Sequence, residues 1–96
     1  MELNAATAAD GTTLTADIGI VGAGPAGLAL AHQLQARGQH VLLLESGGSA
    51  PAPQYQELNA GETAGDPYDE LRLSRCRAVG GTAAVWNTMF QNSPFA

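Results

Sequence analysis

Two short apolar runs flank a stretch with helical periodicity near the beginning of the chain. The first run contains Ile18, Ile20 and Val21, and the second is the unbroken segment 41–44, after His40. Between them, apolar residues recur at helical spacing: Ala26, Leu30, Ala31 and Leu34. The pattern predicts a strand ending at Val21, a helix over 25–37 terminated by Gly38, and a second strand over 40–44.

The second apolar run has no polar alternation, which is typical of a strand covered on both faces of a parallel sheet. Strand, helix and strand in this order predict an α/β fold with a βαβ unit. The fold class we predict is a Rossmann-like βαβ unit, the incomplete N-terminal part of a larger doubly wound domain.

A glycine-rich turn joins the first predicted strand to the helix. Gly22 permits the tight turn, Gly24 allows a pyrophosphate to approach the backbone, and Gly27 lets the helix lie close to the sheet. Pro25 falls at the first helical position, where its missing N–H costs nothing. Because the helix N-terminus also favours anions, the segment predicts a dinucleotide site.

Glu45 follows the second apolar run, 23 residues after Gly22. This spacing is near the roughly 20 residues expected for an acidic group that binds a ribose. A carboxylate there accepts hydrogen bonds from both ribose hydroxyls and disfavours a 2′-phosphate, since two anions would meet. The alternative is a solvated glutamate at the end of a strand.

The next segment departs from a simple nicotinamide-binding domain, in which another helix would follow. Residues 46–53 are rich in Ser, Gly, Ala and Pro, and residues 54–70 carry five acidic side chains. We predict a surface excursion over 46–70 with one helical turn near 55–59, and we assign it no chemistry.

Three of the four cationic residues of the chain, Arg72, Arg75 and Arg77, then cluster before a second glycine-rich turn, Gly80-Gly81. Such a cluster is suited to a phosphate or carboxylate. It is equally compatible with a surface patch paired with nearby carboxylates: Asp66, Asp69 and Glu70.

The order of these motifs resembles the glucose–methanol–choline (GMC) oxidoreductases. The resemblance runs from Asp10-Gly11-Thr12 through the glycine fingerprint and Leu43-Leu44-Glu45-Ser46-Gly47-Gly48 to Arg75-x-Arg77-x-x-Gly80-Gly81-Thr82, and it ends near Trp86. It implies FAD as cofactor and hydride transfer from the CH–OH group of an alcohol or sugar. The cofactor contacts that follow are Gly22, Gly24, Pro25, Ala26, Gly27, Glu45, Ser46, Arg77, Gly80, Gly81 and Thr82.

The chain departs from that family in two places. Some members attach the flavin through a histidine before the tryptophan, and Val85 stands there, so we expect dissociable, non-covalent FAD. Asn87 follows Trp86 where the family often has glycine, so Trp86 is equally compatible with a flavin contact and a core aromatic.

The expected domain organisation is a leader over 1–15 and a partial FAD-binding domain over 16–96. This domain divides into the βαβ unit 16–45, the excursion 46–70 and an Arg-rich GGT loop over 71–90. With 96 residues, the chain is expected to be the N-terminal segment of a longer enzyme. The catalytic base and the substrate site would lie in the missing C-terminal part, so no catalytic residue is assigned here.

Alternatives remain for the function. An NAD-binding Rossmann oxidoreductase fragment would use the same βαβ unit, and a truncated product would be non-catalytic. Cys76 is the single cysteine, and no metal-ligand spacing is present. The net charge of −5 argues against nucleic acid or an anionic membrane as partner, and the absence of a signal or spanning segment predicts a cytoplasmic location.

Overall fold

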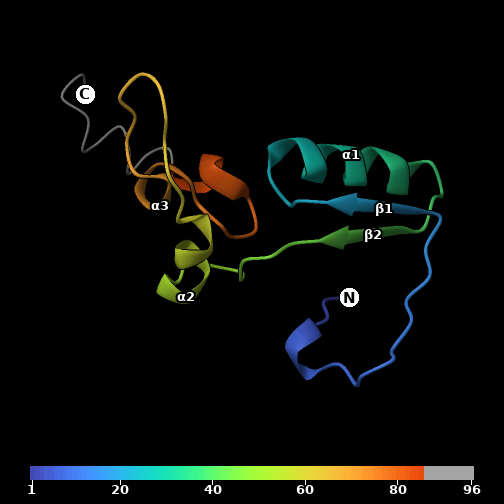
Figure 1. The fold of residues 1–96 in the computed structure, drawn as a ribbon. Coiled ribbons are helices and arrows are strands. Elements are labelled where there is room, and N and C mark those ends of the chain that lie inside the picture. The colour runs from blue at the N-terminus through green and yellow to red at the C-terminus, as the bar shows by residue number, and fades with distance from the viewer. Residues whose placement is uncertain (86–96) are drawn as a thin grey trace.

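The computed structural model describes residues 1–85. Its centre is a parallel two-stranded sheet of β1 (Ile18–Val21) and β2 (Val41–Leu44), connected by α1 (Pro25–Ala36). Figure 1 shows α1 running alongside the two strands. The predicted α/β fold class and βαβ unit are confirmed, and each predicted element is within one residue of its observed bounds.

The helix begins and ends where the sequence predicted. Pro25 is its first residue, Gly24 precedes it as the N-cap, and Arg37 follows as the C-cap. Gly38 has φ +82°, a conformation that glycine adopts without strain and that stops the helix.

The face that α1 turns to the sheet differs from the predicted apolar set. Gly27, Ala31 and Leu34 are half-buried, whereas Ala26 and Leu30 are exposed. The reason is the contact of Gly27 with the turn after β1, which fixes the rotation of the helix. Ala26 and Leu30, which share the helical spacing of Ala31 and Leu34, therefore lie outside the face that packs on the sheet.

The prediction that both faces of the sheet are covered is also wrong for residues 1–85. Ile20 is only 8% exposed and lies beneath α1, near Gly27. Val21 pairs with Leu44 in the sheet, and these two residues are 86% and 48% exposed. Because side chains alternate along a strand, they belong to the opposite face, on which no described helix packs.

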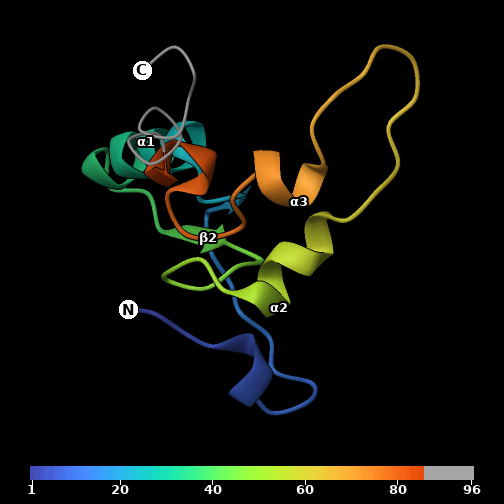
Figure 2. The same cartoon turned by 90° about the vertical axis from the view of Figure 1, so that its left-hand side faces the viewer.

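The remaining elements form a second group beyond the end of the sheet: α2 (Pro53–Gln56), η2 (Glu57–Asn59), α3 (Leu71–Ser74) and η3 (Gly81–Val85). The predicted helical turn near 55–59 is confirmed as α2 with η2. Figure 2 shows the segment between η2 and α3 as a loop that extends away from the rest of the chain. The N-terminal residues 1–15 are exposed throughout and contain η1 (Ala5–Thr7).

Among the described residues, no helix combines the length and the apolar character that crossing a bilayer requires. Trp86, Asn87 and the end of the 71–90 segment lie outside the described residues.

Candidate dinucleotide site

The site is built at the carboxyl ends of the two parallel strands, where α/β folds bind their ligands. Val21 leads into the glycine turn and Leu44 leads into Glu45. The Gly22 N–H donates to the Leu44 carbonyl at 2.7 Å, which holds the two strand ends together beyond the sheet.

The first and third glycines have structural tasks in this turn. Gly22 has φ +102°, in the left-handed region that a side chain would strain. A Cβ on Gly27 would lie 1.9 Å from the Gly22 carbonyl oxygen, so only glycine permits the observed approach of α1 to the turn.

Gly24 is different, because a Cβ built on it meets no protein atom within 4 Å and its φ is −80°. The protein itself therefore does not require glycine at this position. The open space lies at the N-terminus of α1, where free backbone N–H groups and the helix dipole favour an anion. A pyrophosphate fits this position.

Glu45 joins the glycine turn to the turn that follows β2. Its Oε1 accepts from the Ala23 N–H at 3.1 Å, and its Oε2 accepts from the Gly47 N–H at 2.7 Å. Both carboxylate oxygens are thereby fixed in direction, and each retains lone-pair capacity for a further donor. A half-buried carboxylate held in this way can accept hydrogen bonds from the two hydroxyls of a ribose.

A cleft of about 270 Å³ lies beside this carboxylate. It is lined by Val21, Gly22, Leu44, Glu45 and Ser46. The exposed side chains of Val21 and Leu44 thus form one apolar wall of the cleft, next to a carboxylate and a hydroxyl. Such a combination suits a nucleoside, which has an apolar base and a polar sugar.

The Arg-rich segment returns to this site, although it is far from it in sequence. Ala78 forms a parallel bridge with Gly48, and the Val79 N–H donates to the Gly48 carbonyl at 2.9 Å. The Gly80 N–H donates to the Ala23 carbonyl at 2.7 Å. Ala23 and Ala78 are each 1% exposed, so this junction is the most deeply buried part of the described chain.

The second glycine-rich turn lies against the first. A Cβ on Gly81 would come within 3.0 Å of the Gly24 Cα, and Gly80 and Gly81 both have positive φ angles, +97° and +61°. Thr82 accepts from the Cys76 N–H through Oγ1 at 3.1 Å, which leaves its own hydroxyl proton for another acceptor. The structure therefore brings the predicted residues of both glycine turns to one end of α1.

The Arg77 side chain donates three hydrogen bonds to other parts of the chain. Its Nη1 donates to Ser46 Oγ at 2.6 Å, its Nε to Asn59 Oδ1 at 2.8 Å, and its Nη2 to the Leu58 carbonyl at 3.4 Å. The other predicted contact positions, Pro25 and Ala26, are the first two residues of α1 and are exposed.

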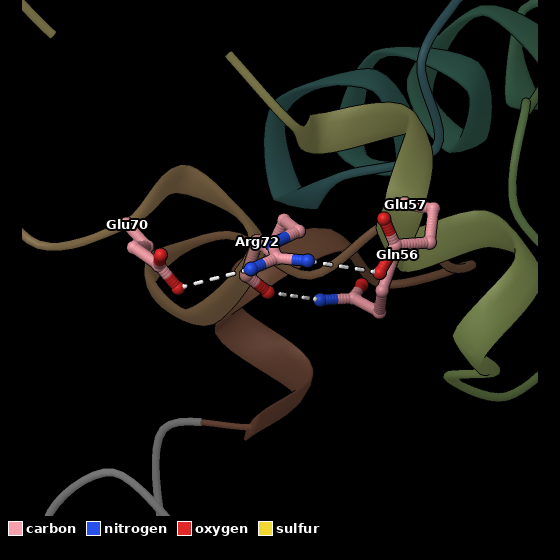
Figure 3. Close-up of polar contacts among 4 residues, drawn as sticks. All are labelled: Gln56, Glu57, Glu70 and Arg72. Atoms are coloured by element: carbon pink, nitrogen blue, oxygen red, sulfur yellow. Dashed lines mark hydrogen bonds and ion pairs between the residues drawn. The ribbon is translucent and has the colours of Figure 1, made fainter. Parts of the chain in front are cut away.

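Of the two explanations left open for the arginine cluster, the surface patch is observed for Arg72 alone. Arg72 pairs with Glu57 at 3.2 Å and with Glu70 at 3.3 Å, as a surface patch would (Figure 3). Arg75 instead donates to the Tyr68 hydroxyl at 3.0 Å. Asp66 and Asp69 form no salt bridge among residues 1–85.

Sequence reasoning missed Gln56, which organises the returning segment. Its Nε2 donates to the carbonyls of Arg72 and Arg75 at 2.7 and 2.8 Å, and its Oε1 accepts from the Arg77 N–H at 2.8 Å. Figure 3 shows the first of these contacts beside the Arg72 ion pairs. No local pattern marks a glutamine in a short helix as the partner of a backbone 16 to 21 residues away.

Residues 20–57 match the family model described as an NAD(P)-binding Rossmann-like domain. No curated protein and no solved structure matches the chain. The matched range begins within β1 and includes the glycine turn, α1, β2 and Glu45. The fingerprint, the fold and this match agree on a Rossmann-like nucleotide-binding segment. Among the described residues, no group of acidic, histidine or cysteine side chains is placed to hold a metal.

Proposed function

We propose that the chain is the FAD-binding N-terminal segment of a GMC-like oxidoreductase that acts on CH–OH groups. The observation that supports FAD is the docking of the Gly80-Gly81 turn on the Gly24 end of α1. A dinucleotide bound there would have two backbone turns on its pyrophosphate instead of one. The order of motifs resembles that of the GMC family, and this resemblance implies that the second turn contacts the cofactor.

The residues present fit such a cofactor. Gly24 leaves open space at the helix N-terminus, and Glu45 presents a fixed carboxylate at the cleft. The proposed contacts are the predicted set: Gly22, Gly24, Pro25, Ala26, Gly27, Glu45, Ser46, Gly80, Gly81 and Thr82. Arg77 belongs to the same predicted set.

A bound flavin would supply the hydride acceptor for the oxidation of an alcohol or sugar. The residues of this chain would bind and orient the ADP half through the helix N-terminus and the ribose carboxylate. The alcohol would be bound, and its proton removed, by residues that this segment does not contain. Because Val85 replaces the histidine of covalent family members, the flavin would be dissociable.

A second candidate is a segment that binds NAD. The match of residues 20–57 to an NAD(P)-binding Rossmann-like family favours it, and Glu45 disfavours the 2′-phosphate of NADP. The two candidates share the ADP half of the ligand and differ in what the Gly80-Gly81 turn contacts.

Titration of the purified chain with FAD and with NAD⁺ separates them, and acid precipitation tests whether a copurified flavin is released. We expect saturable binding of FAD with at least tenfold preference over NAD⁺. Preferential binding of NAD⁺ would transfer the assignment to the second candidate. Binding of neither would overturn both.

Two variants test the site itself. Gly24→Val should abolish binding because its side chain fills the open space at the helix N-terminus. Gly19→Val is the matched control, since Gly19 lies in β1 with no atom within 4 Å of a built Cβ and takes no part in the site. Glu45→Ala should weaken binding by about 1–3 kcal/mol, the usual cost of losing a charge-assisted hydrogen bond.

A further inference from the structure

Arg77 and Ser46 are joined by a hydrogen bond of 2.6 Å across a sequence separation of 31 residues. Ser46 lines the cleft beside Glu45, whereas the guanidinium reaches it from the returning segment. The contact thus links the proposed ribose site to a part of the chain that lies outside the βαβ unit.

The backbone of Arg77 contacts Gly47, the residue that follows Ser46. A Cβ on Gly47 would lie 2.0 Å from the Arg77 carbonyl oxygen and 2.3 Å from its carbonyl carbon, so the two backbones are in close contact. The N–H of Gly47 in turn donates to Glu45 Oε2. The turn 45–47 is therefore held at Ser46 by the side chain of Arg77 and at Gly47 by its backbone.

Arg77 is itself held in place from the other side. Its Nε and Nη2 donate to Asn59 and Leu58 of the η2 region, and its N–H donates to Gln56. The guanidinium has three acceptors: the side-chain oxygens of Ser46 and Asn59, and the Leu58 carbonyl. They are bonded by three different nitrogens of one planar group, a geometry that suits the rigid fork of arginine better than the compact ammonium of lysine. These contacts engage all three nitrogens of the guanidinium and so fix its orientation.

We propose that Arg77 is a positioning residue that orients the Glu45 carboxylate for the ribose by fixing the turn 45–47, and that it does not bind the cofactor through its charge. The inference rests on the proposed function, because the ribose is the ligand that Glu45 would serve. It changes the part of Arg77 in the predicted contact set from a ligand to a support. It also explains why the residue at position 77 is an arginine, since a positive charge alone could come from a lysine.

Arg77→Lys and Arg77→Met separate these two roles, with ADP as the probe because FAD and NAD share that half. If Arg77 acts through its fork, both variants should raise the Kd for ADP about tenfold. Retention of near wild-type affinity by Arg77→Lys, together with a large loss in Arg77→Met, would show a direct charge contact and overturn the proposal. Arg75→Met is the matched control for loss of positive charge, and we expect its Kd within twofold of wild type.

A second readout does not depend on any ligand. Hydrogen exchange at the Gly47 and Ala23 amides reports the two bonds that Glu45 accepts. Both amides should exchange faster in Arg77→Lys while the Gly22 amide, bonded to Leu44 across the strand ends, stays protected. Unchanged exchange at Gly47 would overturn the positioning role, even if the wild-type chain bound neither FAD nor NAD and the proposed function had failed.

Asn59→Ala is a second, milder variant that tests the same role if the Arg77 variants fail to fold. It removes the Nε partner of Arg77 and leaves every residue that lines the cleft unchanged. A positioning role predicts about a threefold rise in the Kd for ADP and faster exchange at Gly47. Unchanged values in both measurements would contradict it.

Discussion

The βαβ unit, residues 16–45, and the region that follows it, residues 46–85, are held together in different ways. The first consists of two paired strands and a 12-residue helix, whose bonds are mostly backbone to backbone. The second contains helices of only three to five residues. It is joined by side chains that reach distant backbone, above all those of Gln56 and Arg77.

This difference determines where the buried contacts of the chain lie. Ile20 belongs to the sheet, whereas Ala23 and Ala78 meet at the junction of the two regions. The junction coincides with the candidate site, because Gly80 donates to Ala23 and Gly81 lies against Gly24. A ligand bound at the glycine turn would therefore touch both regions and stabilise their contact.

The largest effect is expected from breaking the βαβ unit at Gly27. In Gly27→Ala the new Cβ would lie 1.9 Å from the Gly22 carbonyl oxygen, and both partners are backbone. The helix must move away from the turn, at a cost of about 3 kcal/mol in the free energy of unfolding. This exceeds the gain of about 1 kcal/mol from replacing glycine by alanine in a helix. Chemical denaturation followed by circular dichroism measures the difference.

Gly24→Ala is the matched control for that variant. It places the same methyl group three residues earlier, in open space and at an ordinary φ. We expect a loss of less than about 1 kcal/mol, from the poorer N-cap. Equal destabilisation by the two variants would show that close helix packing is not what requires glycine at Gly27.

A smaller effect is expected from Gln56→Ala, which acts only on the second region. It removes three hydrogen bonds to the backbone of Arg72, Arg75 and Arg77, each worth about 0.5–1.5 kcal/mol net. We expect about 2 kcal/mol of local destabilisation, seen as faster hydrogen exchange at the Arg77 amide. The Gly22 amide should keep its protection.

Gln54→Ala tests whether that effect is specific. Gln54 lies in the same short helix, is exposed, and should tolerate the same substitution without change. Faster exchange at Gly22 as well as at Arg77 in Gln56→Ala would contradict the division into two regions. The chain would then open as one cooperative unit.

The contrast between the regions also explains which features the sequence could predict. Strand, helix and glycine roles follow from periodicity and φ angles within a few residues, so their bounds were predicted closely. The rotation of α1 was not, because Leu30 fits the helical period as well as Ala31 does. Only the contact between Gly27 and Gly22 decides between them.

In the second region the sequence predicted the convergence of Gly80 and Gly81 on the site only through the resemblance to a family. The residues that hold the returning segment had no recognisable sequence pattern. Gln56 and Asn59 are polar residues in a polar segment, and their role depends on backbone groups brought to them by the fold. Long-range pairing between side chain and backbone has no periodicity from which it could be predicted.

The smallest effect on stability is expected from removing the ion pairs of Arg72, which lie next to the Gln56 hydrogen bond in Figure 3. The hydrogen bond that Arg72 donates to Glu70, together with the negative charge of Glu57, raises the pKa of Arg72 above its ordinary value. The stabilisation from that shift is present below the ordinary arginine pKa and lost only as pH rises through the raised value. Surface pairs of this kind contribute little, since water and salt screen them. Arg72→Gln should therefore leave the unfolding midpoint unchanged at neutral pH, in low and in high salt. A clear fall in low salt alone would mean that surface charge, and not the amide of Gln56, holds the returning segment against the site.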